Sequence, residues 1–346
     1  MIGHDDTGAK FAVAVYFLAL CKQYGRFSMP AFDVRPLDEA LPFGIVIGGL
    51  TLKLLEDPAI RREIDQLFIE HGMIVFENVE QSDAMQIAIS NCFGPLKEHP
   101  VKGISRVDGD RMPGVIEIRS EPGRGIVEVD GRTVSHWLPW HFDHCYNNEL
   151  NRAGVMRPVN IVEEGGVTGF MDGIALYHAF PKDLLARIEG KEIAYTLNTQ
   201  YDELKYGRPE RYRMIEPKPS TPEFKQQAAS MARAIHPAVW TRPTGEKVLH
   251  VSPYMARGIV GEENEKGDAL LEEVCQVQRQ LEDTCSYHHK WRAGDMGIWD
   301  NLRMLHCVSG CDPQDFRLMY RTTISGDYGF GRWDTVRADG KLLVDA

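Results

Sequence analysis

Short apolar runs of strand length, separated by turn residues, fill much of the chain, and longer segments with helical spacing lie between them. Asp57-Pro58 supplies an N-cap and a proline at the first helical position, and the apolar residues that follow share one face of a helix. We expect this helix to end at His71-Gly72. Helical spacing predicts further helices at about 83–92, 181–189 and 268–281. These short helices are expected at the periphery of the fold.

Strand-like segments follow several of these helices and dominate the C-terminal part of the chain. They lie at about 73–77, 192–197, 287–292, 296–299 and 318–325. Many short strands with peripheral helices predict a mainly β fold, either a barrel or a double-sheet jelly roll. A polar, helix-leaning stretch near 201–235 predicts a helical insertion or lid.

The domain organisation is expected to be simple. The 346 residues contain no repeat, low-complexity tract or linker-like stretch. We therefore expect one domain over 29–346 and an N-terminal extension over 1–28. The apolar run at 11–20 has the length of a signal-peptide core, but Asp5 and Asp6 precede it and no small-residue cleavage site follows.

The charge and cysteine content exclude some function classes. A formal net charge of −11 argues against nucleic-acid or membrane partners, which require clustered lysine and arginine. The seven cysteines are scattered and odd in number, which favours a reduced, cytoplasmic protein. We expect a small-molecule substrate, and a homo-oligomer, either a dimer or a tetramer.

Two separated segments carry candidate metal ligands. In a strand, His141 and Asp143 would point to the same side, and an aromatic, β-prone sequence precedes them. His4 and Asp6 have the same spacing but lie in a polar terminus. With His306, the first pair makes two histidines and one carboxylate, the ligand set of non-haem Fe(II) centres with open coordination positions.

Arg317 and Arg321 follow His306 on a predicted strand and would share one face of it. Two arginines inside a barrel require anions, because an unpaired buried charge is costly. An arginine fork suits a dicarboxylate such as 2-oxoglutarate. The alternatives are an exposed edge strand with solvated arginines, a zinc or manganese hydrolase, and a non-catalytic jelly-roll binding protein.

Over about 32–331, the chain resembles the 2-oxoglutarate-dependent taurine dioxygenase and 2,4-dichlorophenoxyacetate dioxygenase family. The matching motifs are Trp140-His-Phe-Asp143, Gly165-Gly-Val-Thr168, His236-Pro237, Pro243-Thr-Gly-Glu-Lys-Val-Leu249, Trp299-Asp-Asn301, His306, Arg317, Arg321 and Gly326-Asp327. Val167 departs from the family's Gly-Gly-Asp-Thr turn. Trp137 stands where taurine dioxygenases carry an amide, which argues against taurine.

The resemblance implies a double-stranded β-helix in which His141, Asp143 and His306 bind Fe(II). It also implies that Arg317 and Thr168 bind 2-oxoglutarate. His99 and Arg321 would then contact an anionic substrate, and we expect Trp137, Tyr146 and Tyr254 to line the rest of its pocket.

The implied reaction couples O2 to the decarboxylation of 2-oxoglutarate to succinate and CO2, with hydroxylation of a substrate C–H bond. Oxidative cleavage and desaturation by the same cofactors remain alternatives. The expected substrate is a small organic acid with an apolar or aromatic body.

Overall fold

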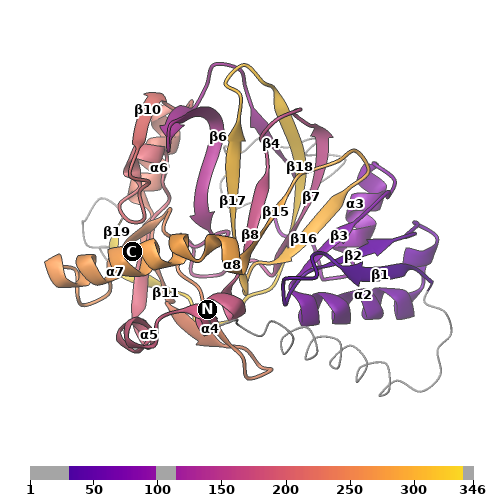
Figure 1. The fold of residues 1–346 in the computed structure, drawn as a ribbon, viewed down its shortest axis with the longest axis horizontal. Helices are drawn as coiled ribbons and strands as arrows, with labels where there is room; N and C mark the ends of the chain where they lie inside the picture. The colour runs from indigo at the N-terminus through magenta and orange to yellow at the C-terminus, as the bar shows by residue number, and fades with distance from the viewer. Residues whose placement is uncertain (1–30, 99–113, 338–346) are drawn as a thin grey trace, which may run out of the picture.

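Two facing sheets form the centre of the computed structural model, which describes residues 31–98 and 114–337 (Figure 1). One sheet has seven strands in the order β1 (Asp33–Pro36), β2 (Ile45–Gly48), β3 (Met73–Phe76), β16 (Met296–Asp300), β7 (Ala153–Asn160), β18 (Arg317–Ile324) and β4 (Val115–Ser120). The other has six, in the order β10 (Tyr212–Glu216), β5 (Ile126–Val129), β6 (Arg132–His141), β17 (Met304–Cys311), β8 (Thr168–Asp172) and β15 (Ser286–His289). This is the predicted mainly β jelly roll.

Side chains from both sheets meet in the space between them. Phe170 of β8 packs on Trp299 of β16, with ring centroids 5.5 Å apart. Ser120 of β4 and Ser135 of β6 join the sheets at another point, with hydroxyl oxygens 3.2 Å apart. Every residue of β8 and of β16 is buried, so these two strands lie at the centre of the fold.

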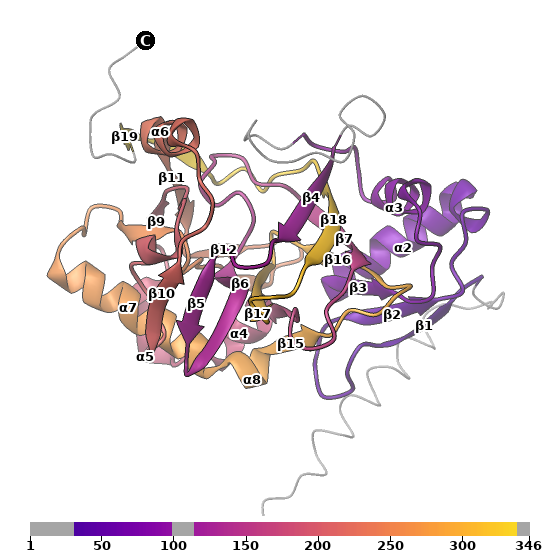
Figure 2. The same cartoon turned by 90° about the horizontal axis from the view of Figure 1, so that it is seen from above.

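The helices α2 (Pro58–His71) and α3 (Asp83–Ser90) pack against the seven-stranded sheet, as Figures 1 and 2 show. Asp57 caps α2 by accepting a hydrogen bond from the backbone N–H of Ala59, and Gly72 ends it with a left-handed φ of 74°. The predicted boundaries of α2 are confirmed.

Four other helices lie on the side of the six-stranded sheet: α4 (Gly173–Ala179), α5 (Lys182–Ile188), α7 (Glu265–Gln280) and α8 (Glu282–Cys285). A short helix, η1 (Leu54–Glu56), precedes α2. The helix predicted from residue 268 begins at Glu265 because the Asn264 side chain caps it there. Within the described part of the chain, no helix is both long enough and apolar enough to cross a membrane.

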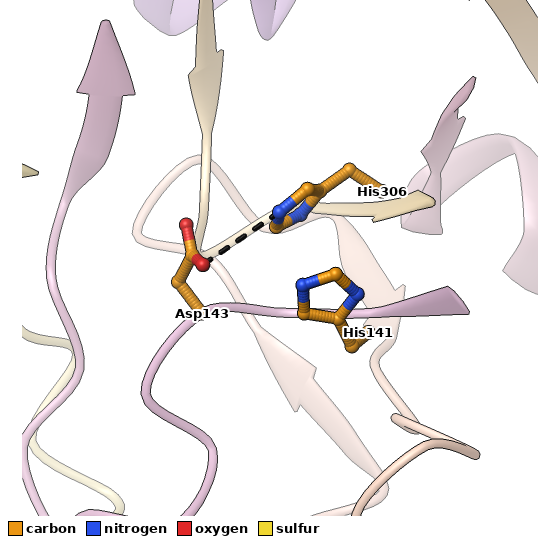
Figure 3. Close-up of side chains that lie close together, drawn as sticks. All are labelled: His141, Asp143 and His306. Carbon is orange, nitrogen blue, oxygen red and sulfur yellow. Dashed lines mark ion pairs between the residues drawn. The ribbon is translucent and has the colours of Figure 1, made fainter. Parts of the chain in front are cut away.

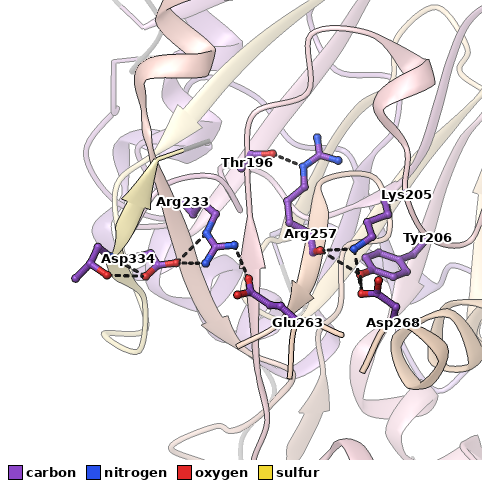
Figure 4. A network of polar contacts seen from close by, with 9 residues as sticks. Thr196, Lys205, Tyr206, Arg233, Arg257, Glu263, Asp268 and Asp334 are labelled. Atoms are coloured by element: carbon purple, nitrogen blue, oxygen red, sulfur yellow. Dashed lines mark hydrogen bonds and ion pairs between the residues drawn. The ribbon is translucent and has the colours of Figure 1, made fainter. Parts of the chain in front are cut away.

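Two smaller sheets complete the fold. One contains β14 (Ala256–Ile259), β9 (Glu192–Tyr195), β11 (Ala232–Pro237) and β19 (Arg332–Arg337), and the other pairs β12 (Val239–Thr241) with β13 (Lys247–Leu249). Polar contacts tie the four-stranded sheet to its surroundings (Figure 4). Arg233 of β11 pairs with Glu263 and Asp334, while Lys205 and Tyr206 both donate to Asp268 of α7.

The segment near 201–235, predicted to be a helical insertion, is only partly helical. It contains η2 (Tyr201–Glu203), the strand β10 and one α-helix, α6 (Pro222–Ser230). Residues 212–216 alternate between partly buried and exposed positions and pair with β5, so they extend the six-stranded sheet. The polar composition that suggested helix reflects the exposed face of this edge strand.

Candidate metal centre

Strand pairing brings the three predicted metal ligands together. His306 on β17 lies directly opposite His141 at the end of β6, and their ring centroids are 4.0 Å apart. Asp143 follows two residues later, with its Oδ1 atom 3.6 Å from Nε2 of His306 (Figure 3). All three side chains are buried, and one ligand atom from each lies within 4.8 Å of the others.

The local backbone differs from the single strand predicted for His141 and Asp143. β6 ends at His141, so Asp143 lies in the following turn. The pairing with β17 shifts register just before this point, leaving Cys307 opposite both Pro139 and Trp140. Proline cannot donate to a strand ladder, and such bulges re-aim the side chains beside them.

The Asn301 side chain forms the two backbone hydrogen bonds to Asp143 that a neighbouring strand would form in a sheet. Its Oδ1 accepts from the backbone N–H of Asp143 at 2.7 Å, and its Nδ2 donates to the Asp143 carbonyl at 3.1 Å. The same Nδ2 lies 3.1 Å from the carbonyl oxygen of Asn151. Asn301 therefore fixes the backbone of the carboxylate ligand.

The electrostatic environment keeps the three candidate ligands in the protonation states that metal binding requires. Burial lowers the pKa of His141 and His306, so both imidazoles are neutral. His141 Nδ1 lies 2.8 Å from the Pro139 carbonyl, which leaves Nε2 for a metal. Burial alone would raise the pKa of Asp143, but the charge of Arg321 outweighs it and holds that pKa below its usual range. Two neutral nitrogens and one anionic oxygen suit Fe(II).

Arg321 holds the carboxylate of Asp143 through both terminal nitrogens. Nη1 lies 2.9 Å from Oδ1 and Nη2 2.5 Å from Oδ2, while Nε has no hydrogen-bond partner. The guanidinium also lies over the Trp299 ring, 5.5 Å from its centroid. A Cβ atom at Gly154 would come within 3.0 Å of both side chains, so glycine permits this close approach.

Arg317 is buried without an acidic partner. It is 2% exposed, no ion pair links it to another described residue, and its Nη2 atom has no hydrogen-bond partner. Burial lowers its pKa to about 10, at which it remains charged at neutral pH. β18 lies between β7 and β4, which excludes the exposed-edge alternative for the two arginines.

Arg317 lines a small cavity open to solvent, together with Ile161, Val162, Gly165, Gly166, Lys290 and Trp291. Gly166 has φ of 61°, and a Cβ atom there would lie 3.1 Å from Arg317 Nε. Thr168, two residues further on, is fully buried, and its hydroxyl accepts a hydrogen bond from Trp291 Nε1 at 2.8 Å. The hydrogen bond between Trp291 and Thr168 could not be predicted, because the two residues are 123 positions apart in the chain.

The residues expected in the substrate pocket are only partly brought together. Tyr254 is buried, with its ring 5.9 Å from the His141 ring. Tyr146 is buried close enough to the centre for Asp143 to contribute to its raised pKa, although burial is the main cause. Trp137 contacts the rings of Tyr201 and Tyr212 at 5.8 and 5.7 Å. His99 lies outside the described residues.

Comparison with known proteins reveals relatives over most of the chain. The model of the taurine catabolism dioxygenase TauD, TfdA family matches residues 33–323. The (S)-phenoxypropionate/alpha-ketoglutarate-dioxygenase of Sphingobium herbicidovorans is 30% identical over 304 residues, covering 86% of this chain and 96% of that protein. The alpha-ketoglutarate-dependent 2,4-dichlorophenoxyacetate dioxygenase of Cupriavidus pinatubonensis is 28% identical, covering 77% and 88%.

A solved structure confirms the fold. The crystal structure of a taurine dioxygenase from Burkholderia xenovorans superposes with a TM-score of 0.62 at 23% identity, covering 92% of this chain and 97% of that one.

Replacing Asn301 by aspartate should weaken metal binding. An aspartate still accepts from the Asp143 N–H but cannot donate to the Asp143 carbonyl, and it adds a charge. We expect Fe(II) affinity, measured by anaerobic titration, to fall roughly 10- to 100-fold, as for other residues that orient ligands. Asn91→Asp, on the exposed C-cap of α3, is the control. Parent-like affinity in Asn301→Asp would show that the clamp does not position the ligand.

Proposed function

The chain belongs to the taurine catabolism dioxygenase TauD, TfdA family and is a 2-oxoglutarate-dependent non-haem iron dioxygenase, and from this premise we propose that it hydroxylates a C–H bond of a small organic acid. The observation that supports the proposal best is the buried trio of His141, Asp143 and His306 in the same interior as the unpaired cation Arg317. A metal ion would complete the group of three side chains, and an anion would neutralise Arg317.

We assign His141, Asp143 and His306 as the Fe(II) ligands, because the donor set and its protonation states fit that ion. When bound, iron and 2-oxoglutarate together supply the oxidising chemistry, in which O2 is reduced, 2-oxoglutarate becomes succinate and CO2, and one oxygen atom enters the substrate. The protein's own contribution is to orient these groups and to exclude water from them.

Arg317 is the proposed partner of the distal carboxylate of 2-oxoglutarate, and Thr168 is proposed to donate a hydrogen bond to the same cosubstrate. Arg317 supplies a buried positive charge with an unsatisfied N–H. The Thr168 oxygen already accepts from Trp291, so its single proton is available to donate elsewhere. Val167, which replaces the acidic residue of the family motif, uses its backbone N–H to donate to Ser309 Oγ at 3.1 Å. The turn that precedes Thr168 is therefore held in place by this hydrogen bond, without the acidic side chain that the family motif has at position 167.

The proposed substrate is an organic acid with an apolar or aromatic body. Trp137, Tyr146 and Tyr254 offer aromatic surface near the centre, and two relatives are named for aryloxy acids. We retain Arg321 and His99 as substrate contacts. Because the carboxylate of Asp143 already pairs with both terminal nitrogens of Arg321, this arginine has little free charge to offer the substrate.

Several finer assignments stay predictions. Desaturation or oxidative cleavage would use the same ligands and cosubstrate. The dimeric or tetrameric state, the cytoplasmic location and the extension at 1–28 rest on the sequence alone. A zinc or manganese hydrolase and a non-catalytic binding protein do not fit membership of a dioxygenase family.

His306→Ala should abolish both iron binding and succinate formation, since only two ligands would remain. Metal content after anaerobic loading and succinate release from 2-oxoglutarate measure the two effects. His178→Ala, at an exposed position on α4, should match the parent protein in both assays. Succinate formation at the parent rate by His306→Ala would contradict the ligand assignment.

Arg317→Ala should weaken 2-oxoglutarate binding, measured through the absorption band of the Fe(II)–2-oxoglutarate complex. A charge-assisted hydrogen bond contributes about 1.5–3 kcal/mol, which corresponds to a rise in Kd of roughly 10- to 150-fold. Arg187→Ala removes an exposed arginine paired with Glu273 and serves as the control. An unchanged Kd in Arg317→Ala would reject its cosubstrate role.

A panel of candidate substrates tests the remaining part of the proposal. Aryloxy and aryl acids should perturb the Fe(II)–2-oxoglutarate band and accelerate succinate formation more than taurine does. A clear preference for taurine, or for neutral polar amino acids, would reject an aromatic acid as substrate.

A further inference from the structure

A lysine from the segment between β10 and α6 is directed towards the metal centre. The ammonium of Lys218 lies over the Tyr201 ring, 4.0 Å from its centroid, and 5.9 Å from the centroid of Tyr254. The Tyr254 ring is in turn 5.9 Å from the ring of the ligand His141. Lys218 therefore faces the aromatic surface already assigned to the substrate.

The backbone of Lys218 is held in place by Gln200, the N-cap of η2. Gln200 Oε1 accepts from the Lys218 N–H at 3.0 Å, and Gln200 Nε2 donates to the Lys218 carbonyl at 3.0 Å. The adjacent turn gives the side chain room, since a Cβ atom at Gly125 would lie 3.3 Å from Lys218 Cγ. The direction of the lysine is thus fixed by the same segment that supplies Tyr201.

The positive charge of Lys218 is not neutralised by a carboxylate. No ion pair connects its ammonium to another residue in the described ranges 31–98 and 114–337. Burial lowers its pKa to about 8, and the charge of Glu203 only partly opposes this effect. Most Lys218 side chains therefore remain charged at neutral pH.

An unbonded polar atom lies in the same region. Nε2 of His136 on β6 is buried and has no hydrogen-bond partner. Burial, with the charges of Arg317 and Lys218, lowers the pKa of His136 to about 3, so its ring is neutral. A cation without a counter-ion, aromatic walls and an unsatisfied polar atom together form a site suited to a small anion.

We propose that Lys218 binds the acid group of the organic substrate and so determines specificity for anions over neutral analogues. The proposal rests on the proposed function and deepens it. Arg317 is assigned to the cosubstrate, and Arg321 is engaged by Asp143, so Lys218 is the cation with its charge still available beside the aromatic residues. The substrate's aromatic body would lie along Tyr201, Tyr254 and Trp137, with its acid group at the lysine.

The test compares an acid with its neutral amide. The parent protein and Lys218→Met are loaded with Fe(II) and 2-oxoglutarate without O2, and phenoxyacetate or phenoxyacetamide is titrated while the Fe(II)–2-oxoglutarate band is followed. We expect Lys218→Met to raise the Kd of phenoxyacetate at least tenfold, as expected for loss of a charge-assisted contact. The Kd values of phenoxyacetamide and of 2-oxoglutarate should stay within twofold. Lys218→Arg should recover part of the affinity for the acid.

Lys225→Met is the matched control, because Lys225 is exposed on α6 in the same segment. It should leave all three Kd values unchanged, and the melting temperature of each variant reports on folding. Equal losses for the acid and the amide would overturn the proposal and assign Lys218 to packing. A raised Kd for 2-oxoglutarate would overturn it by assigning Lys218 to the cosubstrate. If the parent forms the band but no phenoxyacetate binds, this proposal fails; if no band forms, the proposed function fails as well.

Discussion

The structure depends on how one buried carboxylate is neutralised. Asp143 is enclosed by the protein, and a buried carboxylate is stable only with a partner of opposite charge. Arg321 supplies that charge from the opposite sheet through two parallel hydrogen bonds. Because β18 carries Arg321 and β6 leads to Asp143, the same ion pair links the two layers of the jelly roll at the metal centre.

The other parts of the centre follow from this geometry. Gly154 leaves space for Arg321 to reach across, and Trp299 supports both the guanidinium and, at 4.8 Å, the His306 ring. Arg317 and Arg321 are four residues apart on β18, so both guanidinium groups point into the interior. The guanidinium of Arg317 forms no ion pair with a carboxylate of the described residues. One strand thus presents a paired and an unpaired cation, and this difference is why we propose different roles for them.

Local sequence signals predicted a substantial part of this arrangement. Asp57-Pro58 and Gly72 set the ends of α2 through backbone capping, which depends on near neighbours only. The residue types and their order were enough to propose His141, Asp143 and His306 as one group, and the structure brings these three side chains together. The turn at Asp143 could not be predicted, because Asn301, which replaces its strand neighbour, is 158 residues away in the chain. The contact of Trp291 with Thr168 depends in the same way on two segments that are distant in the chain. The strand β10 was missed because its alternation of partly buried and exposed positions is weak in a polar sequence.

The pairing of His306 with His141 also has a consequence for synthesis of the protein. A growing chain reaches His141 and Asp143 long before His306, and the Asn301 clamp and Arg321 come equally late. Domains fold as units during or after translation, and contacts of long sequence separation form slowly. The candidate metal centre can therefore assemble only after nearly the whole domain has left the ribosome, and an incomplete nascent chain would lack one of its proposed ligands.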